Sequence, residues 1–191
     1  MNFKSLVTIA LATATIAIAL PTFSQSSSSV GGDRVTFSCQ NVFDPASGTQ
    51  IPATVAWRPQ RQKNVIFLYW KSDFFSAAGW DPQARCEEVS PKFQAAYDSD
   101  RFNYLTNGKV GAYPVICAAV ERIGETCNQD NFLFTLKKEA DGSKAVDNLM
   151  GIFKGDTRKA RYESSQEEGK IYVSIDKFLL EAPAIEENAS N

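Results

Sequence analysis

Apolar and polar residues alternate along the chain from residue 35 onward, and this pattern predicts strands. Val35, Phe37 and Cys39 alternate with polar residues, a period of two that is typical of a half-buried strand. The cluster 44–48 contains Pro and Gly and is a turn signal, after which we expect a second strand over 51–57. The apolar and aromatic run 65–70 is unbroken, as in a strand covered on both faces, so we expect this third strand at the centre of the sheet.

Similar signals follow in the second half of the chain. Asn107-Gly108 is a type I′ turn signal and predicts a hairpin with strands over 102–106 and 110–120. Two more short strands are predicted, one over 132–136 and one where apolar residues alternate over 171–175. A short apolar turn is expected at Phe178-Leu179-Leu180.

Two segments have the apolar spacing of helices. Asp81-Pro82 is a strong helix start, because Asp accepts a backbone N–H as N-cap and Pro needs no donor at the first helical position. Apolar residues three or four apart carry this helix to about Asp98, and Pro91 either kinks it or makes Ser90 the cap of a second helix. A separate helix is predicted over 145–153.

Clustered strands with two separate helices predict an α+β fold, a mostly antiparallel β-sheet with two helices packed on it. We expect a single domain over 35–181, with no internal repeat and no second boundary. A flexible Ser/Gly-rich linker is predicted over 25–34 and an acidic flexible tail over 182–191.

The first 24 residues have the three parts of an export signal. Lys4 is followed by an apolar segment over 6–20 and then by small polar residues, which favours cleavage before Gln25, with a second candidate site before Leu20. The competing interpretation is an uncleaved anchor, although the segment falls short of the roughly 20 apolar residues that a spanning helix needs. We therefore expect an exported protein of the periplasm, thylakoid lumen or extracellular space, with membrane association as the open alternative.

The cysteines are even in number, as expected of a disulfide framework in an exported chain. Metal binding or redox chemistry would favour a C-x-x-C spacing, whereas even the closest pair has nine residues between its members. We predict two structural disulfides, and the sequence leaves all three pairings open. The four residues are Cys39, Cys86, Cys117 and Cys127.

Composition narrows the chemistry further. The chain contains no histidine, which removes the usual near-neutral acid–base group, His-dependent nucleophiles and the commonest zinc and copper ligand. The net charge is −2, and loss of Lys4 with the leader leaves 19 cations against 22 acids. A small acidic excess argues against nucleic acid as a partner, and we expect neither cofactor nor metal.

Two clusters are candidates for a binding surface. Arg58, Arg61 and Lys63 form a basic loop that could touch anionic lipid head groups, although a solvated hairpin loop has the same composition. Aromatic residues crowd the approach to the Asp81 helix, with Trp70, Phe75 and Trp80 as candidate ligand contacts. The alternative for the aromatic residues is a cluster that closes the core over a sheet edge.

Charged residues near the same helix suggest weaker hypotheses. Asp73, Asp81, Glu87 and Glu88 could include an acid–base pair of the glycosidase kind, but 22 acids make such coincidences common. Arg85 could pair with Glu88, with loop carbonyls or with an anion.

Several short segments between residues 35 and 136 form a combination that is specific because it includes all four cysteines. They are Phe37-Ser38-Cys39, Trp70-Lys71-Ser72, Phe75, Gly79, Pro82, Arg85-Cys86, Val89-Ser90, Phe93-Gln94, Tyr104-Leu105-Thr106, Gly108, Pro114-Val115-Ile116-Cys117, Cys127 and Leu133-Phe134-Thr135-Leu136. In these segments the chain resembles the circadian oscillating protein (COP) domain family of cyanobacteria. The resemblance implies an exported or membrane-associated protein without established biochemical activity, and it supplies no catalytic residue. It also implies an abundance that follows the circadian cycle in the family's namesake.

Three functions remain as hypotheses. The first is a non-enzymatic, disulfide-stapled domain that binds a protein, glycan or membrane surface outside the cytoplasm. The second is a carboxylate-dependent hydrolase that acts on an extracellular saccharide and needs two acids converging in a cleft. The third is a structural protein of envelope assembly that works through an aromatic surface.

Overall fold

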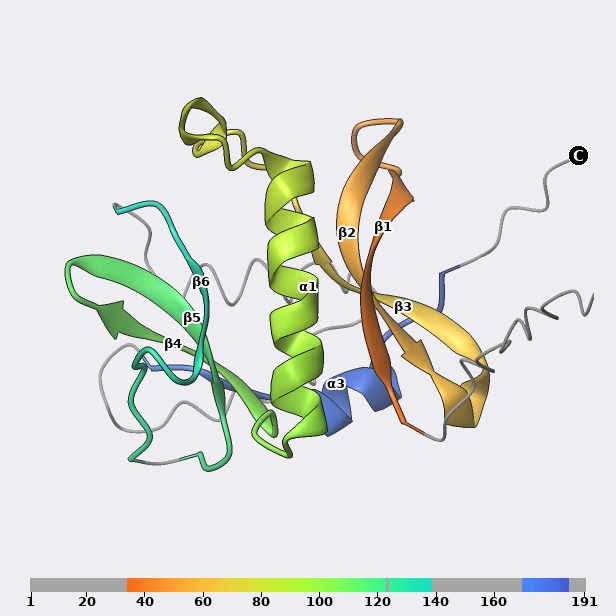
Figure 1. Ribbon diagram of the computed structural model, residues 1–191. Coiled ribbons are helices and arrows are strands. Elements are labelled where there is room, and N and C mark those ends of the chain that lie inside the picture. The colour runs from red at the N-terminus through yellow and green to blue at the C-terminus, as the bar shows by residue number, and fades with distance from the viewer. Residues whose placement is uncertain (1–33, 123, 139–169, 186–191) are drawn as a thin grey trace, which may run out of the picture. The chain divides into compact units, whose positions relative to one another are not determined.

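Two antiparallel sheets form the framework of the α+β fold (Figure 1). The computed structural model describes residues 34–122, 124–138 and 170–185. The first sheet has the order β1-β2-β3 and the second the order β6-β5-β4-β7. The strands are β1 (Thr36–Asp44), β2 (Thr49–Arg58), β3 (Lys63–Tyr69), β4 (Tyr104–Val110), β5 (Tyr113–Ala119), β6 (Phe132–Thr135) and β7 (Tyr172–Ser174).

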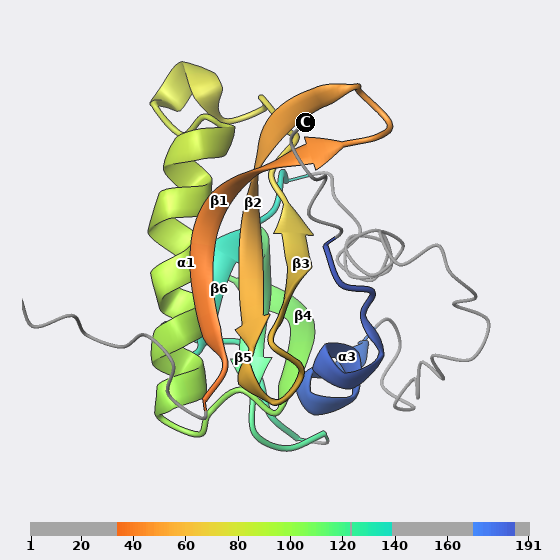
Figure 2. The ribbon, with the colours of Figure 1, turned by 90° about the vertical axis from the view of Figure 1, so that its right-hand side faces the viewer.

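Helices α1 (Pro82–Asp98) and α3 (Ile175–Glu181) pack on these sheets. Helix α1 contacts β1, β2 and β6 and so joins the two sheets, as Figure 1 shows. Helix α3 lies at the end of the first sheet that is remote from the β1–β2 turn (Figure 2). The leader, most of the linker and the helix predicted over 145–153 fall outside the described residues.

Helix α1 begins as the sequence predicts and settles the question about Pro91. Asp81 is the N-cap, and its carboxylate accepts a hydrogen bond of 2.8 Å from the backbone N–H of Ala84. One continuous helix of 17 residues contains Pro91, which is exposed. The helix gives up the hydrogen bond that a residue with an N–H would donate there, while Ser90 lies inside it and caps nothing.

The position of β3 differs from the prediction, because β2 is the central strand and β3 lies at an edge. The unbroken apolar run of β3 has another cause. Val65 and Phe67 belong to the main core, while Ile66 packs on a second, smaller cluster that includes Ile185. The backbone N–H of Ile185 donates to the carbonyl of Asn64, which holds this residue of the predicted tail at the edge of β3, and its side chain packs on the same cluster as Ile66.

The hairpin turn of the second sheet is displaced from the predicted site. Asn107 and Gly108 lie inside β4, and the two-residue turn is Gly111-Ala112, since Val110 pairs with Tyr113. Gly111 has a φ of +60°, which suits the glycine-first preference of a type II′ hairpin. Gly108 has a different role, because a Cβ there would lie 2.5 Å from the Sγ of Cys127.

The C-terminal strand is shorter than predicted, and the apolar turn after it is a helix. Ser174 caps α3, its side chain accepting a hydrogen bond from the backbone N–H of Lys177. Ile175, Phe178 and Leu179 are the buried residues of α3 and have the spacing of one helix face. The spacing of apolar residues therefore changes at Ile175 from the alternation of a strand to the period of a helix, and the strand ends there.

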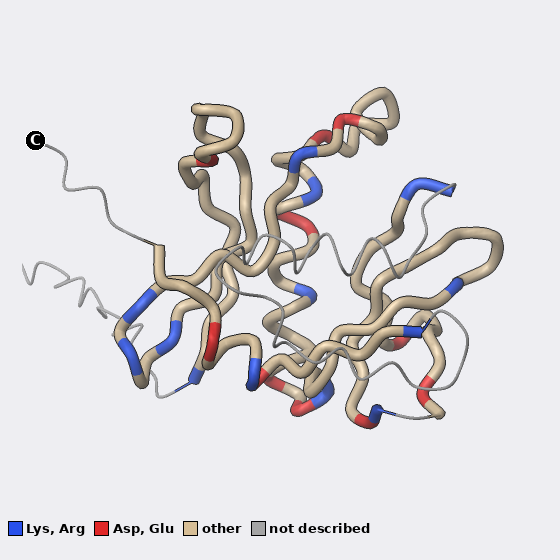
Figure 3. The backbone as a smooth tube through the Cα atoms, turned by 180° about the vertical axis from the view of Figure 1, so that it is seen from behind, with Lys and Arg blue, Asp and Glu red and all other residues tan. Residues whose placement is uncertain are grey.

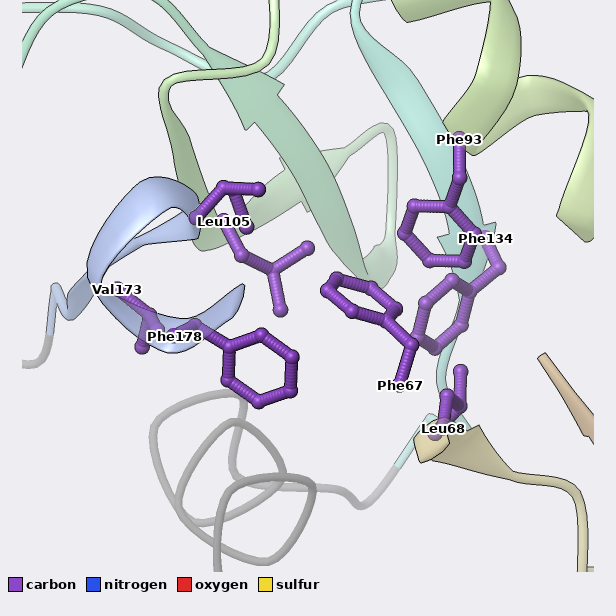
Figure 4. Close-up of a pocket in the computed structure, with 8 residues that line it drawn as sticks. Phe67, Leu68, Phe93, Leu105, Phe134, Val173 and Phe178 are labelled. Atoms are coloured by element: carbon purple, nitrogen blue, oxygen red, sulfur yellow. The ribbon is translucent and has the colours of Figure 1, made fainter. Parts of the chain in front are cut away.

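Aromatic rings fill the core between α1 and the sheets. Phe93 is fully buried, and its ring centre lies 4.9 Å from that of Phe67 and 5.5 Å from that of Phe102. A cavity of about 10 Å³ in this core is lined by apolar side chains, among them Phe67, Phe93 and Phe178 (Figure 4). A water needs roughly this volume and also polar partners, so the cavity is a dry packing gap.

Both disulfides form, and the structure selects one of the three pairings. Cys39 pairs with Cys86, which ties β1 to α1, and Cys117 pairs with Cys127, which ties β5 to the loop before β6. The two disulfides therefore fix α1 to the first sheet and the loop before β6 to the second.

Candidate functional site

The two candidate surfaces lie at opposite ends of the β2–β3 pair. Arg58 pairs with Lys63 at one end of this ladder and Ala53 with Tyr69 at the other. Figure 3 shows the backbone from behind, with the basic 58–63 connection far from the segment that leads into α1. The basic and aromatic clusters therefore belong to separate surfaces.

Arg58 is a buried structural residue, which contradicts its assignment to a surface cluster. Its side chain is among the buried polar groups, and the guanidinium donates to the carbonyl oxygens of Leu179 and Leu180 in the last turn of α3. Burial lowers the pKa of Arg58, and repulsion by Arg61 lowers it further. Only Arg61 and Lys63 of the predicted basic loop are exposed.

Trp70 is also buried, at 2% exposure, so its ring forms part of the core. Its indole Nε1–H donates to the hydroxyl of Thr54 at 3.0 Å, and that hydroxyl lies 2.8 Å from the Ser90 hydroxyl. The ring also packs edge-on against Phe134. The hydrogen bond fixes the ring in one orientation, so the indole is a rigid contact for neighbouring side chains.

Arg85 lies against the Trp70 ring and forms the centre of the candidate site. Its guanidinium carbon is 4.9 Å from the ring centre of Trp70 and 5.1 Å from that of Phe75. Phe74 contacts Phe75 edge-to-face at 4.9 Å, and the backbone N–H of Trp80 donates to the carbonyl of Phe75. We call the five residues Trp70, Phe74, Phe75, Trp80 and Arg85 the Arg85 site.

The Arg85 site combines an exposed apolar rim with a half-buried cation. Phe74 is 56% exposed and Trp80 is 47% exposed, whereas Phe75 and Arg85 are half-buried. Burial lowers the pKa of Arg85, yet a guanidinium stays charged in proteins. The site therefore presents a half-buried positive charge in contact with Phe75, and the two solvent-facing rings belong to the same segment as Phe75.

No carboxylate neutralises Arg85 within the ranges 34–122, 124–138 and 170–185. Glu88, the partner suggested by sequence spacing, has its carboxylate 3.1 Å from the Nζ of Lys92. Glu87 accepts a hydrogen bond of 2.7 Å from Gln83. The sequence identified the aromatic residues and Arg85 separately, but their juxtaposition depends on the packing of α1 against the segment after β3.

Of the four acids considered for acid–base catalysis, three bond to groups of α1. Asp81 caps α1, Glu87 and Glu88 bond to neighbours on their own helix, and all four carboxylates are exposed. The apolar cavity of the core is lined by none of these four acids. Nothing in this geometry pairs two of them for hydrolysis.

Asp44 and Lys71 form a polar pair that sequence patterns did not suggest. The buried carboxylate of Asp44 accepts hydrogen bonds of 2.8 Å from the Nζ of Lys71 and the hydroxyl of Ser47. These two bonds, that of Lys71 first, hold the pKa of Asp44 below its usual range. The pair ties the end of β1 to the segment that follows β3.

The described residues offer neither a metal site nor a membrane-spanning helix. Those residues contain no group of three or more Cys, His, Asp or Glu side chains placed to hold a metal ion. Within the same ranges, no helix has the length and apolar character needed to cross a bilayer.

Comparison with known proteins gives one match. A family model described as circadian oscillating protein COP23 matches residues 36–180, which is most of the chain. No curated protein and no solved structure matches it.

Proposed function

The chain belongs to the circadian oscillating protein COP23 family, and from that premise we propose that it is an exported, non-enzymatic binding domain. It acts at the cyanobacterial cell envelope or in the thylakoid lumen, and the Arg85 site is its contact surface. The family name also leads us to propose that its abundance follows the circadian cycle. Sampling cells through constant light and quantifying the protein would test that part separately.

One observation carries the binding proposal: two large aromatic side chains face solvent in the segment whose Phe75 contacts a half-buried cation. Phe74 and Trp80 are each about half exposed, and both lie in the segment that holds Phe75 against Arg85. Aromatic residues and Arg are the residue types that dominate the binding energy of protein interfaces. Exposed aromatic rings cost solubility, so a site of this composition is most readily explained by a partner that covers it.

Two features support export. The leader has the composition of a signal peptide, and all four cysteines are paired. Disulfides of this structural kind persist in oxidising compartments and are rare in the cytosol. Of the carboxylates weighed for hydrolysis, Asp81 caps α1, Glu87 bonds to Gln83 and Glu88 pairs with Lys92, which supports a non-enzymatic role.

The export proposal is tested by isolating the protein from fractionated cells and determining its N-terminus. We expect a mature chain that begins at Gln25 and is recovered with the periplasmic or lumenal fraction. A chain that retains the leader in the cytosolic fraction would refute export. Retention of the leader in a membrane fraction would instead support the anchored alternative.

The binding proposal is tested with a pair of matched variants. Phe74→Ala with Trp80→Ala removes the exposed rim, whereas Tyr113→Ala with Leu180→Ala removes equally exposed apolar side chains elsewhere. Purified mature proteins are sedimented with washed envelope and thylakoid-lumen fractions. We expect the first variant to lose association and the second to keep it, while equal association of both variants would remove the Arg85 site as the contact surface.

A further inference from the structure

The electrostatic environment of Arg85 indicates what kind of ligand the site accepts. Its cation lies in the first turn of α1, where the helix macrodipole is positive and disfavours a second positive charge. Partial burial adds a desolvation cost for the same charge. Aromatic contacts with Trp70 and Phe75 offset part of these costs.

The remaining requirement of the guanidinium is a set of hydrogen-bond acceptors. Its five N–H donors lie in one plane and match the two oxygens of a carboxylate in a bidentate pair. Among the described residues, the acids nearest in sequence are engaged elsewhere, Glu88 with Lys92 and Asp81 with the backbone of Ala84. An external oxyanion at Arg85 would also interact favourably with the N-terminal end of α1.

The surroundings of Arg85 favour a ligand with a single charge over a polyanion. Asp73, Asp81 and Glu87 are exposed on the same segment and helix, and the neighbouring cation Lys71 is already bonded to Asp44. A membrane rich in anionic lipid or an acidic polysaccharide would bring further charges against these carboxylates. A lone carboxylate gains the direct contact with Arg85 without that repulsion.

We propose that Arg85 binds the carboxylate of an acidic residue in a partner polypeptide, and that apolar side chains flanking this residue pack on Phe74 and Trp80. This inference rests on the proposed binding function and assigns its ligand class. The rigid Trp70 ring and the Cys39–Cys86 bridge hold α1 and Arg85 in place before the ligand arrives, which reduces the ordering cost of binding.

The test uses the mature, oxidised protein and a displayed library of heptapeptides. Each peptide has apolar residues around a central Glu, Asp, Gln or Asn, and the ratio of acid to amide among bound peptides is measured. A charge-assisted pair should enrich the acids about tenfold over the amides. Arg85→Gln should abolish the enrichment, whereas Arg34→Gln should not, because Arg34 also lies over a ring, that of Tyr97, but already pairs with Asp100.

A second variant covers the chance that Arg85→Gln perturbs folding. Arg85→Lys keeps the charge and loses the planar donor pair, so it should reduce the enrichment while retaining a cooperative thermal transition. Titration with phosphatidylglycerol vesicles and with an oligogalacturonate forms the comparison arm.

The outcomes separate this inference from the function on which it rests. Equal binding of acid and amide peptides that depends on Phe74 and Trp80 would overturn the carboxylate pairing and leave the aromatic binding surface standing. Arg85-dependent binding of vesicles or oligogalacturonate, without peptide enrichment, would overturn the polypeptide assignment. Absence of any enrichment from the peptide library would overturn the inference as a whole.

Discussion

Replacing Gly108 by Ala gives a sharp test of how the second sheet and its disulfide are packed. Gly108 pairs with Val115 inside the β4–β5 ladder. A Cβ at Gly108 would lie 2.5 Å from the Sγ and 2.8 Å from the Cβ of Cys127, whereas carbon atoms in contact sit about 3.5–4.0 Å apart. Those atoms cannot rotate away, because Cys127 is bonded to Cys117.

The expected effect combines a steric cost with a smaller backbone gain. Overpacking of this kind costs about 1–3 kcal/mol, and replacing a strand glycine by Ala returns about 0.5–1 kcal/mol. We expect Gly108→Ala to lower the free energy of unfolding by about 1 kcal/mol. In a Cys117→Ala/Cys127→Gly background, which removes the bridge and both opposing atoms, the same change should stabilise the protein by about 0.5–1 kcal/mol.

Urea unfolding of the four proteins, followed by intrinsic fluorescence, measures both effects. The bridge closes a loop of 10 residues, and its loss costs about 2.7 kcal/mol on the loop-entropy relation, within the 5–15 kcal/mol or so that a native domain has available. The sign of the Gly108→Ala effect should therefore reverse between the two backgrounds. Equal losses in both, with a coupling energy below about 0.5 kcal/mol, would refute the close approach of Cys127 to β4.

Three other substitutions test the core, the anchoring of α3 and the buried carboxylate. Phe93→Ala should lower the free energy of unfolding by about 3–5 kcal/mol in urea titrations, because its fully buried ring leaves a cavity. Arg58→Met should cost about 1.5–3 kcal/mol and raise the amide hydrogen exchange of α3, whose last carbonyls lose their donor; unchanged exchange would contradict that anchoring role. Asp44 has a lowered pKa in the folded state, so its contribution to stability is present above its ordinary pKa of about 3.9 and is lost as the pH falls below it. Asp44→Asn should therefore flatten the acid limb of the stability–pH profile in urea titrations, and an unchanged limb would contradict this contribution.

Local signals in the sequence predicted those elements whose formation depends on adjacent residues. The turn after β1 and the start of α1 are of this kind, because Pro, Gly and a capping Asp act on their own backbone. Asp81 and Pro82 take the positions expected from their side chains. Tertiary contacts had little to add there, so the expectation and the structure agree.

Signals with two possible causes were less informative. Glycine after Asn107 suits a tight turn, but it equally suits a strand that another side chain approaches closely, and Cys127 supplies that approach. The apolar run of β3 has two causes in the same way, because an edge strand can also be covered on both faces. The pairing of Cys127 and the position of Ile185, which decide these cases, are long-range facts that no local pattern contains.

The sequence did not indicate that Arg58 and Trp70 are buried, because both residue types occur at surfaces and in cores. Arg58 was assigned to a basic loop because of its neighbours in sequence, yet its acceptors lie in α3, more than 120 residues away. Trp70 was assigned to an aromatic surface, yet its indole N–H donates to Thr54 in β2, whose hydroxyl in turn bonds to Ser90 in α1. A buried polar group is recognised by its partners, and these partners come from other elements.

Among the described residues Arg85 has no carboxylate partner, because two local interactions compete for Glu88. Glu88 lies three residues after Arg85 and four before Lys92, so sequence spacing allows both pairs. On a helix, a Glu that precedes a Lys by four residues has the favoured orientation relative to the macrodipole, whereas a cation that precedes its acid does not. Stacking on Trp70 and Phe75 further directs the Arg85 side chain toward the aromatic segment and away from Glu88. Lys92 therefore pairs with Glu88, and within the described residues the half-buried guanidinium of Arg85 has no carboxylate partner, which is the basis for proposing an acceptor from another molecule.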